Sequence, residues 1–285
     1  MPCRAFRKPQ LVKMTDPSPD DLYAQIRSLD TGDVLLYRTR DLGATFNAVM
    51  QGSLYSHVSM VVCGDPDKLR EMYPKDYKDC GKSDLAILEV VPVRGVALFP
   101  LEARLARTID NIQYLSVRRH SGIITDKSRA NLDVFMKEVL GRKLEMATTD
   151  MARSLFFNRL RGKLGGDNKE EHWDKFFCSE LVAEALQQLF IVREEGLCSN
   201  NLIPSSFAEP RNPTKHKGRS FDFTERVTLP GHSYGSEEIL VVPNGPLYNA
   251  LKERKRQMKE EYKRKKQEQG EVKHTQHISI FNFGK

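Results

Sequence analysis

Short apolar stretches separated by polar turns run through most of the chain, and their periods predict both strands and helices. Runs rich in β-branched residues and bounded by turn residues favour strands, and they occur at 31–38, 56–63, 84–93, 111–119 and 237–243. Helical patterns occur at 19–29, 42–52, 98–107, 127–140 and 178–189. Short strands interspersed with helices predict an α+β domain over 30–245. We expect a flexible basic lead-in with a short helix at 1–29 and a basic, partly helical or disordered tail at 246–285.

The positive charge of the chain lies at its ends. The net charge is +7, but the segment from Lys252 to Lys266 alone has a surplus of six basic residues, and residues 1–15 have a surplus of four. The body of the chain is therefore slightly acidic, which argues against specific nucleic-acid binding by the folded domain. The tail is either a solvated helix or a contact for an anionic membrane, nucleic acid or partner protein.

Composition sets the expected compartment. No apolar run reaches the ~18–20 residues that span a bilayer, and the first 21 residues lack the apolar stretch of a secretory signal. The cysteines are too scattered for a zinc site or a disulfide framework. They are Cys3, Cys63, Cys80, Cys178 and Cys198. We expect a cytoplasmic protein, with peripheral membrane contact through the tail as an option, and no metal or organic cofactor.

Cys178 begins an amphipathic helix in the segment WDKFFCSELVAEAL, although cysteine is a poor helix cap. The thiol lies on the apolar face of this helix, at its first turn. A helix N-terminus favours thiolate over thiol, and thiolate is the nucleophile. The alternative is a cysteine that simply packs in the core. The residues that share the face with Cys178 are Leu181, Val182, Ala185, Leu186 and Leu189.

His57 and Glu89 are the candidate base and orienting group for that thiol. His57 starts a strand that is apolar on both faces, so the imidazole is at least half-buried; the alternative is a core histidine with no chemical role. Glu89 interrupts an apolar strand, where a buried carboxylate needs a partner such as imidazole. The alternative is an edge strand on which Glu89 faces water. The other six histidines lie in polar or irregular sequence and are expected at the surface.

The motifs GDVLLYR, SHVSMVV, ILEVVPV and FFCSELVAEAL resemble those of circularly permuted papain-like enzymes of the NlpC-type superfamily, especially the YiiX/YaeF-like amidases. Lecithin:retinol acyltransferase-like enzymes are more distant relatives of that group. The histidine strand precedes the cysteine helix here, which is the permuted order. The resemblance covers about residues 30–245 and implies a small, mostly antiparallel sheet packed against the helix that carries the nucleophilic cysteine.

The resemblance also implies residue roles. Cys178 would be the nucleophile, His57 the general base and then acid, and Glu89 the orienting residue. Gly32 would make the turn before the first strand, and Asp33 would have a structural role. Where the superfamily often has an oxyanion-assisting tyrosine, this chain has Trp173, Phe176 and Phe177, so the oxyanion hole is left to the Cys178 N–H and a second donor. Tyr37 and Ser56 are candidates for that donor, and Ser179 and Phe177 complete the expected substrate pocket.

Three functions follow as hypotheses. The first is a cysteine hydrolase that cleaves an amide or ester bond through a thioester. The second is an acyltransferase or lipase that acts on acyl lipids at membranes. The third is a binding protein of the same fold without catalytic activity. The expected substrate is accordingly a small molecule, a peptide or an acyl lipid.

Overall fold

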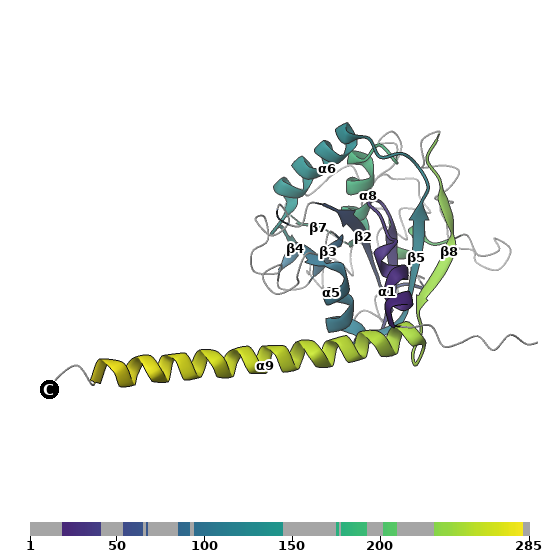
Figure 1. Ribbon diagram of the computed structural model, residues 1–285. Helices are drawn as coiled ribbons and strands as arrows, with labels where there is room; N and C mark the ends of the chain where they lie inside the picture. Colours follow the sequence, from purple (N-terminus) through teal and green to yellow (C-terminus); the bar gives the residue numbers. More distant parts are fainter. Residues whose placement is uncertain are drawn as a thin grey trace, which may run out of the picture.

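The computed structural model describes residues 19–40, 54–64, 67, 85–91, 94–144, 175–176, 178–192, 202–209 and 231–281 (Figure 1). Six strands form one sheet in the order β4-β3-β2-β1-β5-β8, and every neighbouring pair is antiparallel. The strands are β1 (Val34–Thr39), β2 (His57–Cys63), β3 (Leu85–Val91), β4 (Gly95–Pro100), β5 (Ile112–His120) and β8 (Tyr234–Val241). The predicted α+β class with a mostly antiparallel sheet is confirmed.

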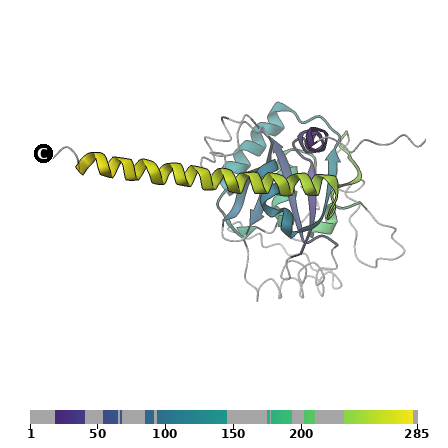
Figure 2. The same ribbon diagram turned by 60° about the horizontal axis from the view of Figure 1, so that its bottom comes forward.

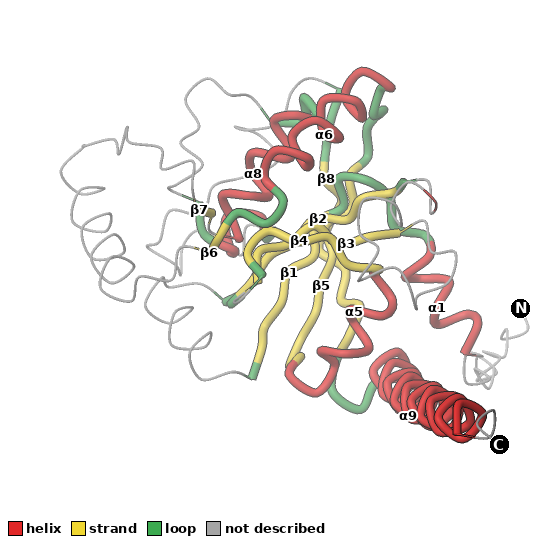
Figure 3. The backbone as a smooth tube through the Cα atoms, turned by 90° about the vertical axis from the view of Figure 1, so that its left-hand side faces the viewer, coloured by secondary structure: helices red, strands yellow, loops and turns green. Residues whose placement is uncertain are grey.

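Helices cover both faces of this sheet (Figure 3). One face carries α6 (Asp126–Val139) and α8 (Cys178–Gln188). The other carries α1 (Pro19–Arg27), α5 (Leu101–Thr108) and the first turns of α9 (Pro246–Phe281). Four short elements complete the described chain: the 3-10 helices η1 (Ile109–Asn111) and η3 (Pro204–Phe207), and the parallel two-residue strands β6 (Lys143–Leu144) and β7 (Lys175–Phe176).

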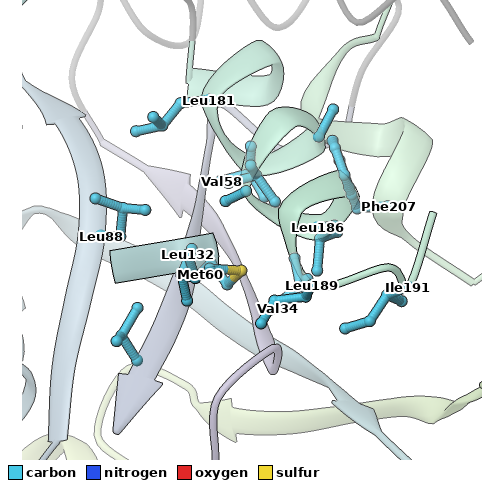
Figure 4. Packing of buried hydrophobic residues seen from close by; sticks show 14 of the residues in the cluster. Val34, Val58, Met60, Leu88, Leu132, Leu181, Leu186, Leu189, Ile191 and Phe207 are labelled. Atoms are coloured by element: carbon cyan, nitrogen blue, oxygen red, sulfur yellow. The ribbon is translucent and has the colours of Figure 1, made fainter. Parts of the chain in front are cut away.

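Two apolar cores follow from the alternation of side chains along the strands. On one face, Val58 and Met60 of β2 pack with Leu181 and Leu186 of α8 (Figure 4). On the other face, Val61 belongs to the cluster that contains α5 and the start of α9. The central strands β1 and β2 are therefore buried on both sides, which is why their sequences are almost continuously apolar.

The helix predicted at 98–107 is partly wrong. Leu98 and Phe99 are the end of β4, which was not predicted, and the helix begins only at Leu101. Gly95, with a φ of 72°, opens this strand directly after β3, and Pro100 closes it. Proline has no N–H for the ladder and its fixed φ suits a helix entrance, so the boundary lies there. The helix predicted at 42–52 lies outside the described residues.

Segments on either side of the predicted domain at 30–245 contribute residues to its core. Leu247 and Leu251 of α9 are 4% and 0% exposed, and Ile26 of α1 is 2% exposed. The hydroxyl of Tyr23 donates to the carbonyl of Ala250 at 3.0 Å, which links α1 to α9. Helix α9 then leaves the domain as a single long rod (Figures 1 and 2). Among the described helices, none combines the length and apolar character needed to cross a bilayer.

His120 and His232, expected at the surface, are instead half-buried against one another. His120 Nε2 lies 3.1 Å from His232 Nδ1, and the rings are stacked with centroids 5.3 Å apart. Burial, together with the neighbouring His232, lowers the pKa of His120 to about 4. The pair joins the end of β5 to the start of β8, a long-range contact that the local sequence could not reveal.

The turn before β1 needs both of its predicted residues. Gly32 has a φ of 91°, in the left-handed region that favours glycine, and its carbonyl accepts a hydrogen bond from the Tyr234 hydroxyl at 2.8 Å. The buried Asp33 carboxylate accepts from the backbone N–H groups of Asp30 and His120 at 3.0 and 2.7 Å. This carboxylate ties the turn to β5 and has a structural role.

Replacing Gly32 by alanine is expected to lower the free energy of unfolding by about 1–3 kcal/mol. The alanine would have to adopt a positive φ, which is strained for a residue with a side chain, and its Cβ would lie 3.2 Å from Ile191 Cδ1. Urea unfolding followed by circular dichroism would measure the change. Gly235→Ala is the matched control, because that glycine has no positive φ and its Cβ would meet only the Arg119 carbonyl, at 3.8 Å. An equal loss in both variants would contradict the assigned strain.

Candidate active site

Three elements that are distant in sequence bring Cys178, His57 and Glu89 together. His57 is the first residue of β2, Glu89 lies in the neighbouring β3, and Cys178 is the first residue of α8. Met60 pairs with Leu88 in the antiparallel register of β2 and β3, so the next position along places Glu89 opposite Ser59. Ser59 is two residues from His57 and therefore lies on the same face of the sheet. Helix α8 packs on the opposite face of the sheet. Because His57 begins its strand, the imidazole can reach Glu89 on one side and the Cys178 sulfur on the other.

The Glu89 carboxylate is buried and uses both of its oxygens. Oε2 lies 3.0 Å from His57 Nε2, and Oε1 accepts a hydrogen bond from Arg104 Nε. The side chains of Glu89, His57 and Arg104 are 3%, 22% and 25% exposed. Burial disfavours the charged carboxylate, but His57 and Arg104 outweigh it and lower the pKa of Glu89. Glu89 is thus an ionised, two-partner acceptor, and the alternative of a water-facing edge residue is wrong.

Arg104 was not identified from the sequence. It lies in α5, and its guanidinium carbon is 4.8 Å from the centroid of the Phe99 ring in β4. This cation–π contact orients the guanidinium toward Glu89. The sequence held one physical indication of such a residue. A single neutral partner does not compensate a buried carboxylate, so Glu89 needs a further partner. With 98–107 interpreted as one helix, however, Phe99 and Arg104 could not be placed correctly.

The His57 side chain and the backbone N–H groups of Val58 and Ser179 lie next to the Cys178 sulfur and favour its thiolate form. Burial disfavours the thiolate, but these donors outweigh it and lower the pKa of Cys178. For His57, burial disfavours the imidazolium, but Cys178 and then Glu89 outweigh it and raise the pKa to about 10. The opposite shifts favour a thiolate–imidazolium pair at neutral pH. Since Nε2 faces Glu89, Nδ1 is the imidazole nitrogen left for the thiol.

The position of Cys178 in the helix explains why both contacts are available. The half-buried thiol packs against the core cluster that contains Leu181 and Val182, as the apolar stripe predicted. At the first turn of α8 the sulfur also lies beside unsatisfied backbone N–H groups and the positive end of the helix dipole. A thiol deeper in the helix would have the packing without these donors.

The hydroxyls of the expected pocket residues are engaged within the protein. The buried Tyr37 hydroxyl accepts from Ser59 Oγ at 3.1 Å, and its ring centroid lies 5.4 Å from that of His57. Ser56 Oγ donates to the Tyr37 carbonyl at 3.2 Å, and Ser179 Oγ donates to the Leu202 carbonyl at 2.6 Å. These contacts brace the start of β2 and the start of α8. Phe177 lies outside the residues whose surroundings the structure describes.

Comparisons with known proteins give a coarse structural likeness. No protein-family model matches the sequence, and no curated protein matches it. A solved structure described as the metalloprotein yiiX from Escherichia coli O157:H7, DUF1105, aligns with 18% identity and a TM-score of 0.37, covering 74% of this chain and 98% of that chain. Among the described residues of this chain, no group of three or more histidine, cysteine, aspartate or glutamate side chains is arranged to hold a metal ion.

Proposed function

We propose that this protein is a cysteine hydrolase of the permuted papain-like type, in which Cys178, His57 and Glu89 form the catalytic triad. One observation carries the proposal: the His57 ring lies 3.0 Å from the buried Glu89 carboxylate and next to the Cys178 sulfur, which begins a helix. A nucleophile, a base and an orienting group in this order are the components that covalent catalysis requires.

The proposed reaction proceeds in two steps. The Cys178 thiolate attacks the carbonyl carbon of an amide or ester, and the negative charge that moves to the carbonyl oxygen is stabilised by the backbone N–H of Cys178. The His57 imidazolium then gives its Nδ1 proton to the leaving nitrogen or oxygen as that bond breaks, which leaves a thioester. In the second step His57 takes a proton from water, the hydroxide attacks the thioester carbonyl, and the thiolate leaves with release of a carboxylic acid.

Glu89 and Arg104 support the two reaction steps through His57, from the side of the imidazole that faces away from Cys178. The Glu89 carboxylate accepts a hydrogen bond from the Nε2–H group, fixes the ring orientation and stabilises the imidazolium. Arg104 keeps Glu89 ionised and is a positioning residue. The acyl group is the part of the substrate that becomes attached to the protein, so trapping the thioester would identify the substrate class.

Thiol reactivity tests the proposed ion pair directly. We expect iodoacetamide to alkylate Cys178 at a rate that changes little between about pH 6 and pH 9, because the thiolate is already formed there. Cys63 is an internal control, since burial and the Asp30 carboxylate raise its pKa to about 12. Peptide mass spectrometry of the full chain would follow both sites.

His57→Ala should raise the pKa of Cys178 and restore the tenfold increase in alkylation per pH unit that an ordinary thiol shows below its pKa. A wild-type Cys178 that already behaves in this ordinary way would overturn the ion pair. A thiolate that forms but turns over no acyl substrate would favour the binding protein without catalytic activity.

A further inference from the structure

Helix α9 has a charge pattern that its packing on the domain does not use. The root of the helix is fixed, since Lys252 and Lys255 bind Asp110 at 3.0 and 2.6 Å, and Arg254 binds Glu102 at 3.1 Å. Met258 is the last residue that packs against the apolar core on this face. From residue 259 to residue 268 every side chain is exposed.

Four cations on the outer part of α9 fall on one face of the helix. They lie at i, i+3, i+7 and i+10, a spacing that places them along one side of a helix over about 15 Å. They are Arg256, Lys259, Lys263 and Lys266, and we call them the basic stripe. Among the described residues, no carboxylate forms an ion pair with the last three.

Acidic residues border one edge of the stripe, where its first member, Arg256, pairs with Glu253 at 2.7 Å. Arg264 pairs with Glu268 at 3.7 Å on another side of the helix, and Glu253, Glu260 and Glu261 fall on that side as well. Tyr262, which is 69% exposed, borders the opposite edge of the stripe. The rod thus presents a straight row of cations with an aromatic residue along one edge and acidic residues along the other.

We propose that the basic stripe docks the protein on the surface of a membrane that contains anionic phospholipids. A straight, one-sided row on a projecting rod can bring all its charges to a flat surface together, and basic residues near an anionic bilayer add to binding. Tyr262 is the kind of residue that is enriched at headgroup level. A helix in a groove of duplex nucleic acid would have phosphates along both flanks, whereas one flank here is acidic.

The test compares two double variants of the full-length protein that have equal charge. Lys263→Gln/Lys266→Gln removes two cations of the stripe, and Arg264→Gln/Lys265→Gln removes two adjacent cations outside it. Binding is measured by co-sedimentation with vesicles of phosphatidylcholine that contain about 30% phosphatidylserine. With about fivefold in affinity per cation near such a surface, we expect the stripe variant to bind roughly thirtyfold more weakly and the other variant to lose much less.

Binding should also vanish on vesicles of phosphatidylcholine alone and weaken at high salt. Equal losses in the two variants, or no binding to the anionic vesicles, would overturn the proposal. So would tighter binding of an RNA or DNA duplex with the same dependence on Lys263 and Lys266. Circular dichroism would check that α9 stays helical in both variants. Cys178→Ala should leave vesicle binding unchanged, so this test and that of the proposed function fail independently.

Discussion

Replacing Cys178 by alanine is expected to reduce turnover of p-nitrophenyl esters and aminoacyl anilides by about 10³-fold or more, because the proposed nucleophile that forms the thioester is removed. Loss of one triad member typically removes nearly all the rate that the triad provides. Absorbance assays at neutral pH would measure turnover. In the wild-type protein, rapid acid quenching followed by mass spectrometry should show an acyl group on the peptide that contains Cys178.

The controls separate chemistry from folding. Cys63→Ala changes the other described cysteine, which lies at the end of β2 away from the triad, and turnover should persist. Urea unfolding should show that Cys178→Ala stays folded, since it deletes only one half-buried sulfur. Undiminished turnover in a folded Cys178→Ala protein would refute the proposed function. Loss of turnover without any acylated peptide would point instead to a thiol that binds substrate.

Arg104→Met is expected to lower the free energy of unfolding by about 2–3 kcal/mol at neutral pH and also to reduce turnover. In this variant the Glu89 carboxylate, which is 3% exposed, would keep His57 as its charged partner but lose Arg104. Breaking a buried pair from one side costs about 3–5 kcal/mol, and we reduce that value because Arg104 is one-quarter exposed. Arg107→Met, on the exposed side of the same helix, is the matched control and should change little.

The pH dependence of this variant distinguishes positioning from simple destabilisation. Arg104 lowers the pKa of Glu89, so its removal raises that pKa and moves the acidic limb of kcat/KM to higher pH. A carboxylate with a depressed pKa stabilises the fold above its unfolded pKa, and this contribution is lost as pH falls through the folded pKa. The stability difference between wild type and variant should therefore narrow below about pH 4.

A double variant sharpens the test of Arg104. Glu89→Leu/Arg104→Met removes both buried charges, and stability should recover over Arg104→Met alone because no buried charge is left without its partner. Turnover should not recover, since His57 then lacks the carboxylate that orients it. Arg104→Lys retains the positive charge and should keep the acidic limb near its wild-type position. If the acidic limb of Arg104→Met stayed in place, Arg104 would be a stabilising residue only.

Much of the local structure was determined by the sequence itself. Strands at β1, β2, β3, β5 and β8 and helices at α6 and α8 fall where the apolar periods predicted them, because each period matches the geometry of one element. The position of Cys178 at a helix start and the need of Glu89 for a partner also followed from local chemistry. The boundary at Pro100 was misjudged because a four-residue apolar run does not distinguish strand from helix.

Only the tertiary structure decided how the site is assembled. The antiparallel register between β2 and β3 brings Glu89 within 3.0 Å of His57, and the packing of α8 on β2 supplies the sulfur. The second partner of Glu89, Arg104, depends on a strand that the sequence pattern did not reveal. Contacts of this kind join segments that are far apart in the sequence. The periodicity of apolar residues reports the local structure and burial of each segment, but it does not show which distant segment packs against it.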